Sequence, residues 1–150
     1  MTTAAGLQTV LTVPARFRGP ERTANGGWVG GTLAGVLAGA RQGCPVEVTL
    51  HRPVPLETDL VLGRVANTTT LSDGDGLLVE AIPVAEELTP PPFVPFTVAA
   101  RAEAGYAGLR YHPFPGCFVC GPARAPGDGL RIFCGPTDDG SRFAGPWTPA

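Results

Sequence analysis

Glycine recurs at every fourth position of one apolar stretch, and this spacing constrains the fold more than any other feature. The segment 24–43, ANGGWVGGTLAGVLAGARQG, has Asn25 at the N-cap position and Gly43 as a stop signal, which predicts a helix over residues 26–41. Each interior glycine costs a helix about 1 kcal/mol relative to alanine. Because a bare stripe lets another backbone approach closely, we expect a buried helix, enclosed by a sheet or pressed on a partner helix. The stripe consists of Gly27, Gly31, Gly35 and Gly39.

Alternation of apolar and polar residues predicts strands on both sides of this helix. Residues 7–18 suit an edge strand, because a proline interrupts a run of β-branched residues. Residues 46–51, 59–71 and 77–84 alternate with a period of two. The last two runs are joined by SDGDG at 72–76, whose Asp-Gly pairs are strong hairpin signals. The sequence thus predicts an antiparallel meander after the helix.

The chain becomes rich in proline and glycine after this meander. Five prolines between 83 and 95 favour an extended connection that cannot be a central strand. Residues 97–106 predict a short helix, and short strands are expected at 130–133 and 141–143. From residue 110 onward, 14 of 41 residues are proline or glycine, so this part is expected to be rich in loops. We therefore predict one domain over 1–109 and a loop-rich C-terminal segment over 110–150.

Charge and hydropathy exclude several classes of function. The 150 residues carry 11 basic and 13 acidic side chains, a net charge of -2, so no nucleic-acid partner is expected. The longest uncharged run, 24–40, has 17 residues and six glycines, whereas a membrane helix needs about 20 strongly apolar residues; no membrane span is expected. The chain shows no export signal, so we expect a cytoplasmic protein with free thiols.

Two cysteines form a C-x-x-C motif, Cys117 and Cys120. Together with His112 and Cys134 they would supply four nitrogen and sulfur ligands for zinc, but the spacing is not that of a usual zinc finger. Reduced, partly buried thiols or a structural turn are the alternatives, and we expect no metal. A redox C-x-x-C normally opens a helix, and the Gly-Pro pair that follows argues against one here.

The order of a strand, a glycine-rich helix opening with Asn-Gly-Gly, and an antiparallel meander resembles the hotdog fold of acyl-CoA thioesterases and dehydratases. ANGGWVGG at 24–31, followed by VEVTLHRPVPLETDLVL at 46–62, is similar to the thioesterase-like branch of that superfamily. The resemblance implies an α+β fold in which a long central helix is wrapped by a curved antiparallel β-sheet. It also implies pairing of such units, either in a homodimer or in a tandem of two hotdogs.

A second resemblance lies in the C-terminal segment. CFVCGPARAPGDGL at 117–130 is similar to the opening of other hotdog thioesterase-like proteins, and RFAGP at 142–146 echoes RFRGP at 16–20. A five-residue echo can be chance or a true repeat. If it is a repeat, residues 110–150 resemble the first strands of a second hotdog unit, which is incomplete in this chain.

The thioesterase resemblance implies an acyl-CoA or related thioester as ligand, with no cofactor. Backbone N–H groups of Gly26 and Gly27 at the helix N-terminus would polarise the thioester carbonyl, and the Asn25 amide would hold water or the carbonyl. Alternatively, Asn25 only caps the helix and the glycines only pack. Arginine side chains would bind the CoA phosphates, although the sequence does not single one out. The arginine candidates are Arg41, Arg52 and Arg64.

The sequence does not reveal a general base for thioester hydrolysis. Residues 26–40 contain no ionisable side chain, and the nearest carboxylates in sequence, Glu47, Glu57 and Asp59, are expected to face solvent. Dehydratase chemistry is not favoured either, because neither His51 nor His112 precedes or lies on the central helix. Two functions therefore stay open: hydrolysis of an acyl thioester, and a non-catalytic module that binds acyl ligands or stabilises an assembly.

Overall fold

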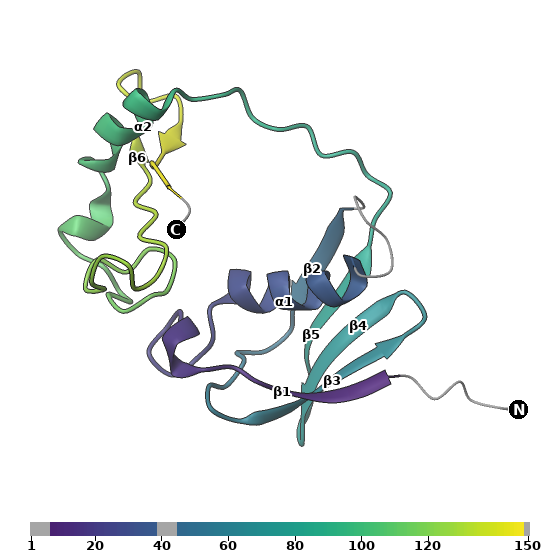
Figure 1. Ribbon diagram of the computed structural model, residues 1–150. Coiled ribbons are helices and arrows are strands. Elements are labelled where there is room, and N and C mark those ends of the chain that lie inside the picture. The colour runs from purple at the N-terminus through teal and green to yellow at the C-terminus, as the bar shows by residue number, and fades with distance from the viewer. Residues whose placement is uncertain (1–6, 39–44, 149–150) are drawn as a thin grey trace, which may run out of the picture. The chain divides into compact units, whose positions relative to one another are not determined.

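The computed structural model describes residues 7–38 and 45–148 (Figure 1). Contacts divide the chain into two compact units. Unit 1 comprises Met1–Ala15 and Arg22–Thr89, and unit 2 comprises Arg16–Glu21 and Pro90–Ala150. Unit 2 thus includes a short N-terminal segment, Arg16–Glu21, which we call the hook. No helix among the described residues has the length and apolar character needed to cross a membrane.

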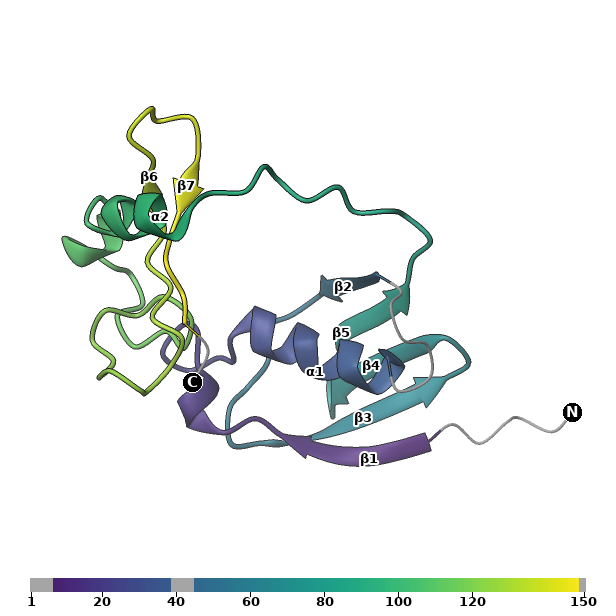
Figure 2. The same cartoon turned by 45° about the horizontal axis from the view of Figure 1, so that its top comes forward.

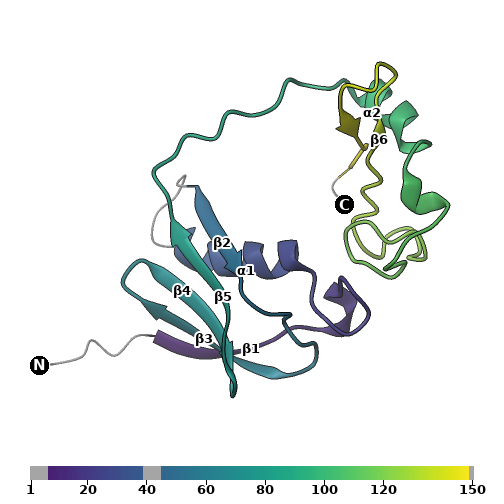
Figure 3. The same ribbon diagram turned by 180° about the vertical axis from the view of Figure 1, so that it is seen from behind.

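Unit 1 contains a five-stranded antiparallel sheet in the order β1-β3-β4-β5-β2, which Figure 3 shows from behind. The structure confirms the predicted edge strand, the strand predicted at 46–51, which ends one residue earlier, and the hairpin around 72–76. β1 is shorter than the predicted 7–18, because a 3-10 turn occupies Ala15–Phe17. The strands are β1 (Leu7–Thr12), β2 (Val46–Leu50), β3 (Asp59–Val65), β4 (Thr68–Asp73) and β5 (Gly76–Pro83).

The predicted single strand over 59–71 is wrong, because the chain reverses within it. β3 and β4 pair in register with Val65 opposite Thr68, so Ala66 and Asn67 form a two-residue turn. Ala66 has φ 53°, a left-handed conformation that alanine adopts only at a cost. The two-residue reversal shifts the phase of the alternation: the buried positions are 60 and 62 in β3 but 69 and 71 in β4.

The helix α1 (Gly26–Ala38) lies across one face of the sheet (Figure 2) and contacts β5, β4 and β2. Its sheet-facing side chains, Val29, Leu33 and Leu37, are buried. They recur at positions i, i+4 and i+8, the spacing of one helical face. The sheet contributes buried residues from three neighbouring strands to the same core. These are Leu60, Leu62, Leu71, Val79 and Ala81.

The expectation that the sheet encloses the glycine stripe is wrong for the described residues, whereas its packing on a partner helix stays a prediction. Gly27, Gly31 and Gly35 are all exposed, and a Cβ built on Gly31 or Gly35 meets no heavy atom within 4 Å. The helix is therefore half-buried: Val29, Leu33 and Leu37 face the sheet, and the described glycines of the stripe face away from it. Gly39, like the rest of 39–44, lies outside the described residues.

The architecture of unit 1 is mixed helix and strand, with an antiparallel sheet that carries a helix on one face. This agrees with the α+β class and with a hotdog-like arrangement at a coarse level. The long central helix over 26–41 is not evident, because the described helix has 13 residues and ends at Ala38. The predicted residues 39–41 lie outside the described part of the chain.

Unit 2 has little regular secondary structure. Its helix α2 (Phe96–Glu103) confirms the predicted short helix, and a 3-10 turn follows at Ala107–Leu109. Residues 84–95 are extended without strand pairing, as expected. The strands are displaced from the predicted 130–133 and 141–143: β6 (Gly135–Pro136) pairs with β7 (Phe143–Ala144). A small apolar cluster joins α2 to β7 and consists of Val94, Ala99, Ala102 and Ala144.

A buried arginine connects the loops of unit 2. The side chain of Arg124 is 5% exposed. Its Nε donates to Gly116 O at 2.8 Å, and its Nη1 donates to both carboxylate oxygens of Asp128 at 3.0 and 3.1 Å. Its Nη2 donates to Arg16 O, so the same guanidinium binds the hook. Phe118 N adds a 2.7 Å hydrogen bond to Arg18 O.

The compact units differ from the predicted division of the chain after residue 109. Residues 90–109, including α2, group with the C-terminal segment, and the hook joins them from the N-terminal side. The interpretation of 110–150 as the first strands of a second hotdog unit stays a prediction.

Candidate functional site

The predicted site lies at the N-terminus of α1, which backbone pairing holds in unit 1. Thr23 forms an isolated antiparallel bridge with Pro55, and Ala24 N donates to Val54 O at 2.8 Å. Val54 and Val13 are buried beneath this junction, 3% and 0% exposed. The chain therefore enters the helix from a fixed, strand-like segment, so the position of the first helical turn is well defined relative to the sheet.

Asn25 is the N-cap that the sequence predicts. Its Oδ1 accepts a hydrogen bond from Trp28 N at 3.0 Å, and its carbonyl accepts the first helical bond from Val29 N at 3.1 Å. An N-cap side chain satisfies one of the N–H groups that the first turn leaves without a helical acceptor. The amide oxygen of Asn25 is thus engaged in capping, which favours the capping role over direct contact with a substrate.

The two glycines after the cap leave the first turn without side chains. Gly26 is half-buried against β2, where a Cβ would lie 3.0 Å from Leu50 Cδ1. Gly27 is exposed, and a Cβ there would lie 3.3 Å from Asn25 Oδ1. The first N–H groups of a helix carry a partial positive charge and have no intrahelical acceptor. This turn can therefore receive an oxygen atom that carries or develops negative charge.

The three carboxylates considered as bases are exposed, as the sequence predicts: Glu47, Glu57 and Asp59. Two of them accept hydrogen bonds from residues that are distant in the sequence. Asp59 Oδ1 accepts from the Thr12 hydroxyl at 2.7 Å, and Glu57 accepts from Ala15 N. These bonds join the segments that flank β1 and β3, so both groups have structural partners. His51 is also exposed and directly follows β2.

The arginines considered for phosphate binding have structural partners where the structure describes them. Arg52 holds the β4–β5 hairpin: its Nη2 donates to Asp73 Oδ1 at 2.7 Å and to Gly76 O at 2.9 Å. The hydrogen bond from Arg52 lowers the pKa of Asp73. Arg64 Nη1 donates to Val36 O, near the end of α1, at 3.4 Å. Arg41 lies outside the described residues. These contacts favour neither Arg52 nor Arg64 as a ligand for the CoA phosphates.

The C-x-x-C motif lies in a turn of unit 2. The Sγ atoms of Cys117 and Cys120 are 3.4 Å apart; Cys117 is buried, and Cys134 is exposed. Burial, and then the bond to Cys117, raise the pKa of the Cys120 thiol. Nδ1 of His112 accepts from Phe114 N at 2.9 Å. Among the described residues, no group of three or more His, Cys, Asp or Glu side chains is placed to hold a metal.

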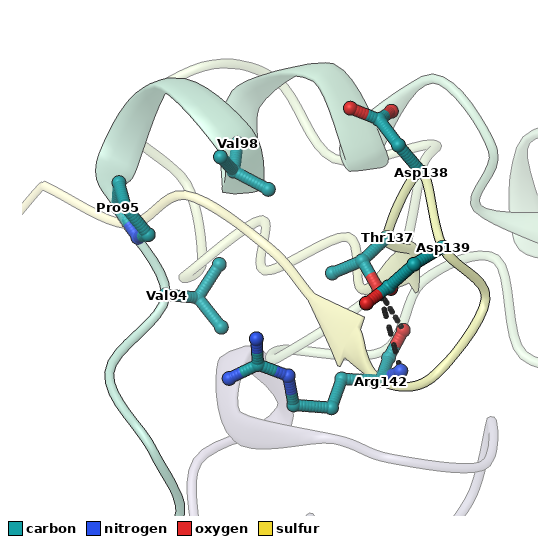
Figure 4. Close-up of a pocket in the computed structure, with 7 residues that line it drawn as sticks. All are labelled: Val94, Pro95, Val98, Thr137, Asp138, Asp139 and Arg142. Carbon is teal, nitrogen blue, oxygen red and sulfur yellow. Dashed lines mark hydrogen bonds between the residues drawn. The ribbon is translucent and has the colours of Figure 1, made fainter.

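Unit 2 also contains a pocket of about 270 Å³ that the sequence does not predict (Figure 4). One wall is apolar and comes from the N-terminal end of α2; the other is polar and comes from the β6–β7 turn. Hydrogen bonds from Thr137 and Ser141 keep the pKa of Asp139 at about 2, and Arg142 Nη1 donates to Pro92 O at 3.0 Å. The lining residues are Val94, Pro95, Val98, Thr137, Asp138, Asp139 and Arg142.

The chain was compared with known families, curated proteins and solved structures. No family model and no curated protein matches it. A crystal structure of a thioesterase superfamily protein is similar, with 22% identity and a TM-score of 0.44. This match covers 52% of the present chain and 49% of the other, so it spans about half of each. A similarity at this level says nothing about individual site residues.

Proposed function

We propose that unit 1 is a hotdog-type domain that binds an acyl thioester, such as acyl-CoA, at the N-terminus of α1 and hydrolyses it. One observation carries the proposal: the first turn presents Gly26 and Gly27 after a fixed cap, with Gly27 exposed. The absence of side chains allows a carbonyl oxygen to approach the backbone N–H groups. The resemblance of ANGGWVGG at 24–31 to thioesterase-like proteins supports the same site.

The chemistry follows from where charge develops. When water adds to the thioester carbon, negative charge passes to the carbonyl oxygen, and the N–H groups of Gly26 and Gly27 would donate to it. One such donor typically contributes 10²–10³-fold in rate. The tetrahedral species then expels the thiolate of CoA. The general base would come from a partner chain or a second hotdog unit, since residues 26–40 supply none.

A non-catalytic acyl-binding module is the second candidate, and a specific observation favours it. The α1 segment has no ionisable side chain, and the Asn25 oxygen is engaged by Trp28 N. The same helix N-terminus would then hold an acyl carbonyl without activating water. The two candidates share a ligand and differ in turnover.

Release of free CoA from a panel of acyl-CoAs, read beside calorimetric binding, separates the candidates. A blank without substrate corrects for the four cysteines of the chain. Asn25→Asp retains a good N-cap but places negative charge beside the developing oxyanion, so we expect at least a tenfold loss of turnover. Gly27→Val should obstruct the same approach. Gly31→Val is the matched control, because a Cβ at Gly31 meets no atom within 4 Å.

Turnover that falls in Asn25→Asp and Gly27→Val but not in Gly31→Val supports the hydrolase. Binding without turnover, weakened by the same two variants, supports the non-catalytic module. If the folded protein neither binds nor hydrolyses any acyl-CoA, both candidates are wrong.

A further inference from the structure

We propose that Cys117 and Cys120 form a reversible intramolecular disulfide by exchange with a small-molecule disulfide such as oxidised glutathione. The pair lies in unit 2, and the proposal does not depend on the thioesterase function. Two thiols three residues apart in a fixed turn are a site for thiol–disulfide exchange, and the arrangement of the loop around them carries the inference.

The sulfur atoms are already close to bonding distance. Cys117 Sγ and Cys120 Sγ are 3.4 Å apart, and a disulfide requires about 2.05 Å. Gly121 N donates to Cys117 O at 2.9 Å and closes the turn that brings the two side chains together. A Cβ at Gly121 would lie 2.5 Å from Cys117 N, so the turn requires glycine at this position. Closure therefore needs a small side-chain movement and no rearrangement of the turn.

Hydrogen bonds fix the residues between and beside the two cysteines. Phe118 N donates to Arg18 O at 2.7 Å, and Phe118 O accepts from Leu130 N at 2.8 Å. The Phe118 ring meets Phe17 edge to face, with centroids 4.9 Å apart. The hydroxyl of Tyr106 donates to Cys120 O at 3.3 Å. Because the folded loop already holds the two thiols together, forming the disulfide costs less conformational entropy than it does in the unfolded chain.

The exchange balances without a metal or an enzyme. The more accessible Cys120 sulfur, as thiolate, attacks one sulfur of glutathione disulfide, forms a mixed disulfide and releases one glutathione thiolate. Cys117 then loses its proton and attacks the Cys120 sulfur, which releases the second glutathione. The two protein sulfurs are oxidised by two electrons in total, and one glutathione disulfide is reduced to two thiols.

The test uses the full chain equilibrated in glutathione buffers of increasing oxidised-to-reduced ratio, then acid-quenched, alkylated and digested with trypsin. Because cleavage follows arginine except before proline, Cys117 and Cys120 share the peptide 111–124, whereas Cys44 and Cys134 fall in the peptides 42–64 and 132–142. We expect peptide 111–124 to appear unalkylated and two hydrogen atoms lighter. Half-conversion should occur at a ratio about tenfold lower than for the same chain in urea.

Cys134→Ser is the matched control, since it removes an exposed thiol of the same unit, and its midpoint should stay within about twofold of the parent chain. Cys117→Ser should abolish the lighter peptide and leave only a glutathione adduct on Cys120. The proposal is overturned if peptide 111–124 stays alkylated at both cysteines in all buffers. It is equally overturned if Cys134 is the bonding partner, or if folding makes the pair no easier to oxidise than in urea.

Discussion

The two units of this chain reach a compact state by different means. Unit 1 buries branched side chains between a helix and a sheet, with Val29 and Leu33 fully inaccessible to solvent. Unit 2 has an eight-residue helix and two-residue strands, and its loops meet around the guanidinium of Arg124. A region too rich in glycine and proline for regular structure can thus be organised by one buried cation that binds several carbonyl groups and a carboxylate.

The largest effect that tests this contrast is expected in unit 1. Leu33→Ala removes a side chain with 0% exposure and leaves a cavity under α1, so the free energy of unfolding should fall by about 4 kcal/mol. Denaturant titration measures the loss, and hydrogen exchange locates it. Protection should fall in β3, β4 and β5 and persist in α2. An equal loss of protection in both units would show that they unfold together and would remove the contrast.

Arg124→Ala is expected to have the next largest effect, confined to unit 2. It removes the bonds to Gly116 O and Arg16 O and both bonds to Asp128, so unit 2 should lose about 3 kcal/mol. Arg101→Ala is the matched control, because its ion pair with Asp138 is exposed on both sides and contributes about 1 kcal/mol or less. Hydrogen exchange of the loops at 116–132 measures the difference. Equal, small effects of the two variants would mean that Arg124 does not organise this unit.

A smaller effect of opposite sign is expected on the glycine stripe. Gly35→Ala should stabilise unit 1 by about 1 kcal/mol, because the position is exposed, helical and open to a methyl group. Thermal and denaturant unfolding of dilute protein give the change. If alanine instead destabilises the protein, and does so more at high concentration, the stripe contacts a partner helix and the original expectation from its spacing holds for the assembled state.

The smallest effect concerns the pH response of unit 2. Burial, and then a hydrogen bond to Cys120, raise the pKa of Tyr106 from 10.0 to about 12. The neutral phenol is therefore favoured by folding, and its contribution to stability, full below pH 10, is lost as pH rises toward 12. Phenolate absorbance in a Tyr111→Phe variant isolates Tyr106, the other of the two tyrosines. Titration near pH 10 in the folded variant would contradict the predicted burial.

Local signals predicted part of the fold and part of the site. The Asp-Gly pairs at 72–76 identified the β4–β5 hairpin, and the alternation at 46–51 predicted β2 with one residue too many at its C-terminal end. Asn25 was predicted as an N-cap and is one. Each of these features depends on residues close together in sequence, where turn geometry and capping act directly.

Features that depend on distant contacts were not predictable from one sequence. The α1 segment is apolar on several sides, so its pattern did not distinguish a glycine face toward the sheet from one away from it. The turn at Ala66 was missed because Ala66-Asn67 is not one of the Asn-Gly or Asp-Gly pairs typical of two-residue hairpin turns. Arg124 binds Arg16 O, which is distant in the sequence, and Gly116 O, which lies in a loop. No short-range sequence pattern identifies either of these partners.

The hook has a consequence for how the protein is made. Arg16–Glu21 leaves the ribosome well before Pro90–Ala150, so the last part of the chain to be synthesised completes its unit around one of the first. Unit 2 therefore cannot complete its fold until Pro90–Ala150 has been synthesised, and it does so around a segment whose two ends continue into unit 1. A C-terminal fragment expressed from residue 90 would lack the carbonyl groups of Arg16 and Arg18, and adding back a peptide spanning 16–21 is a direct way to restore them.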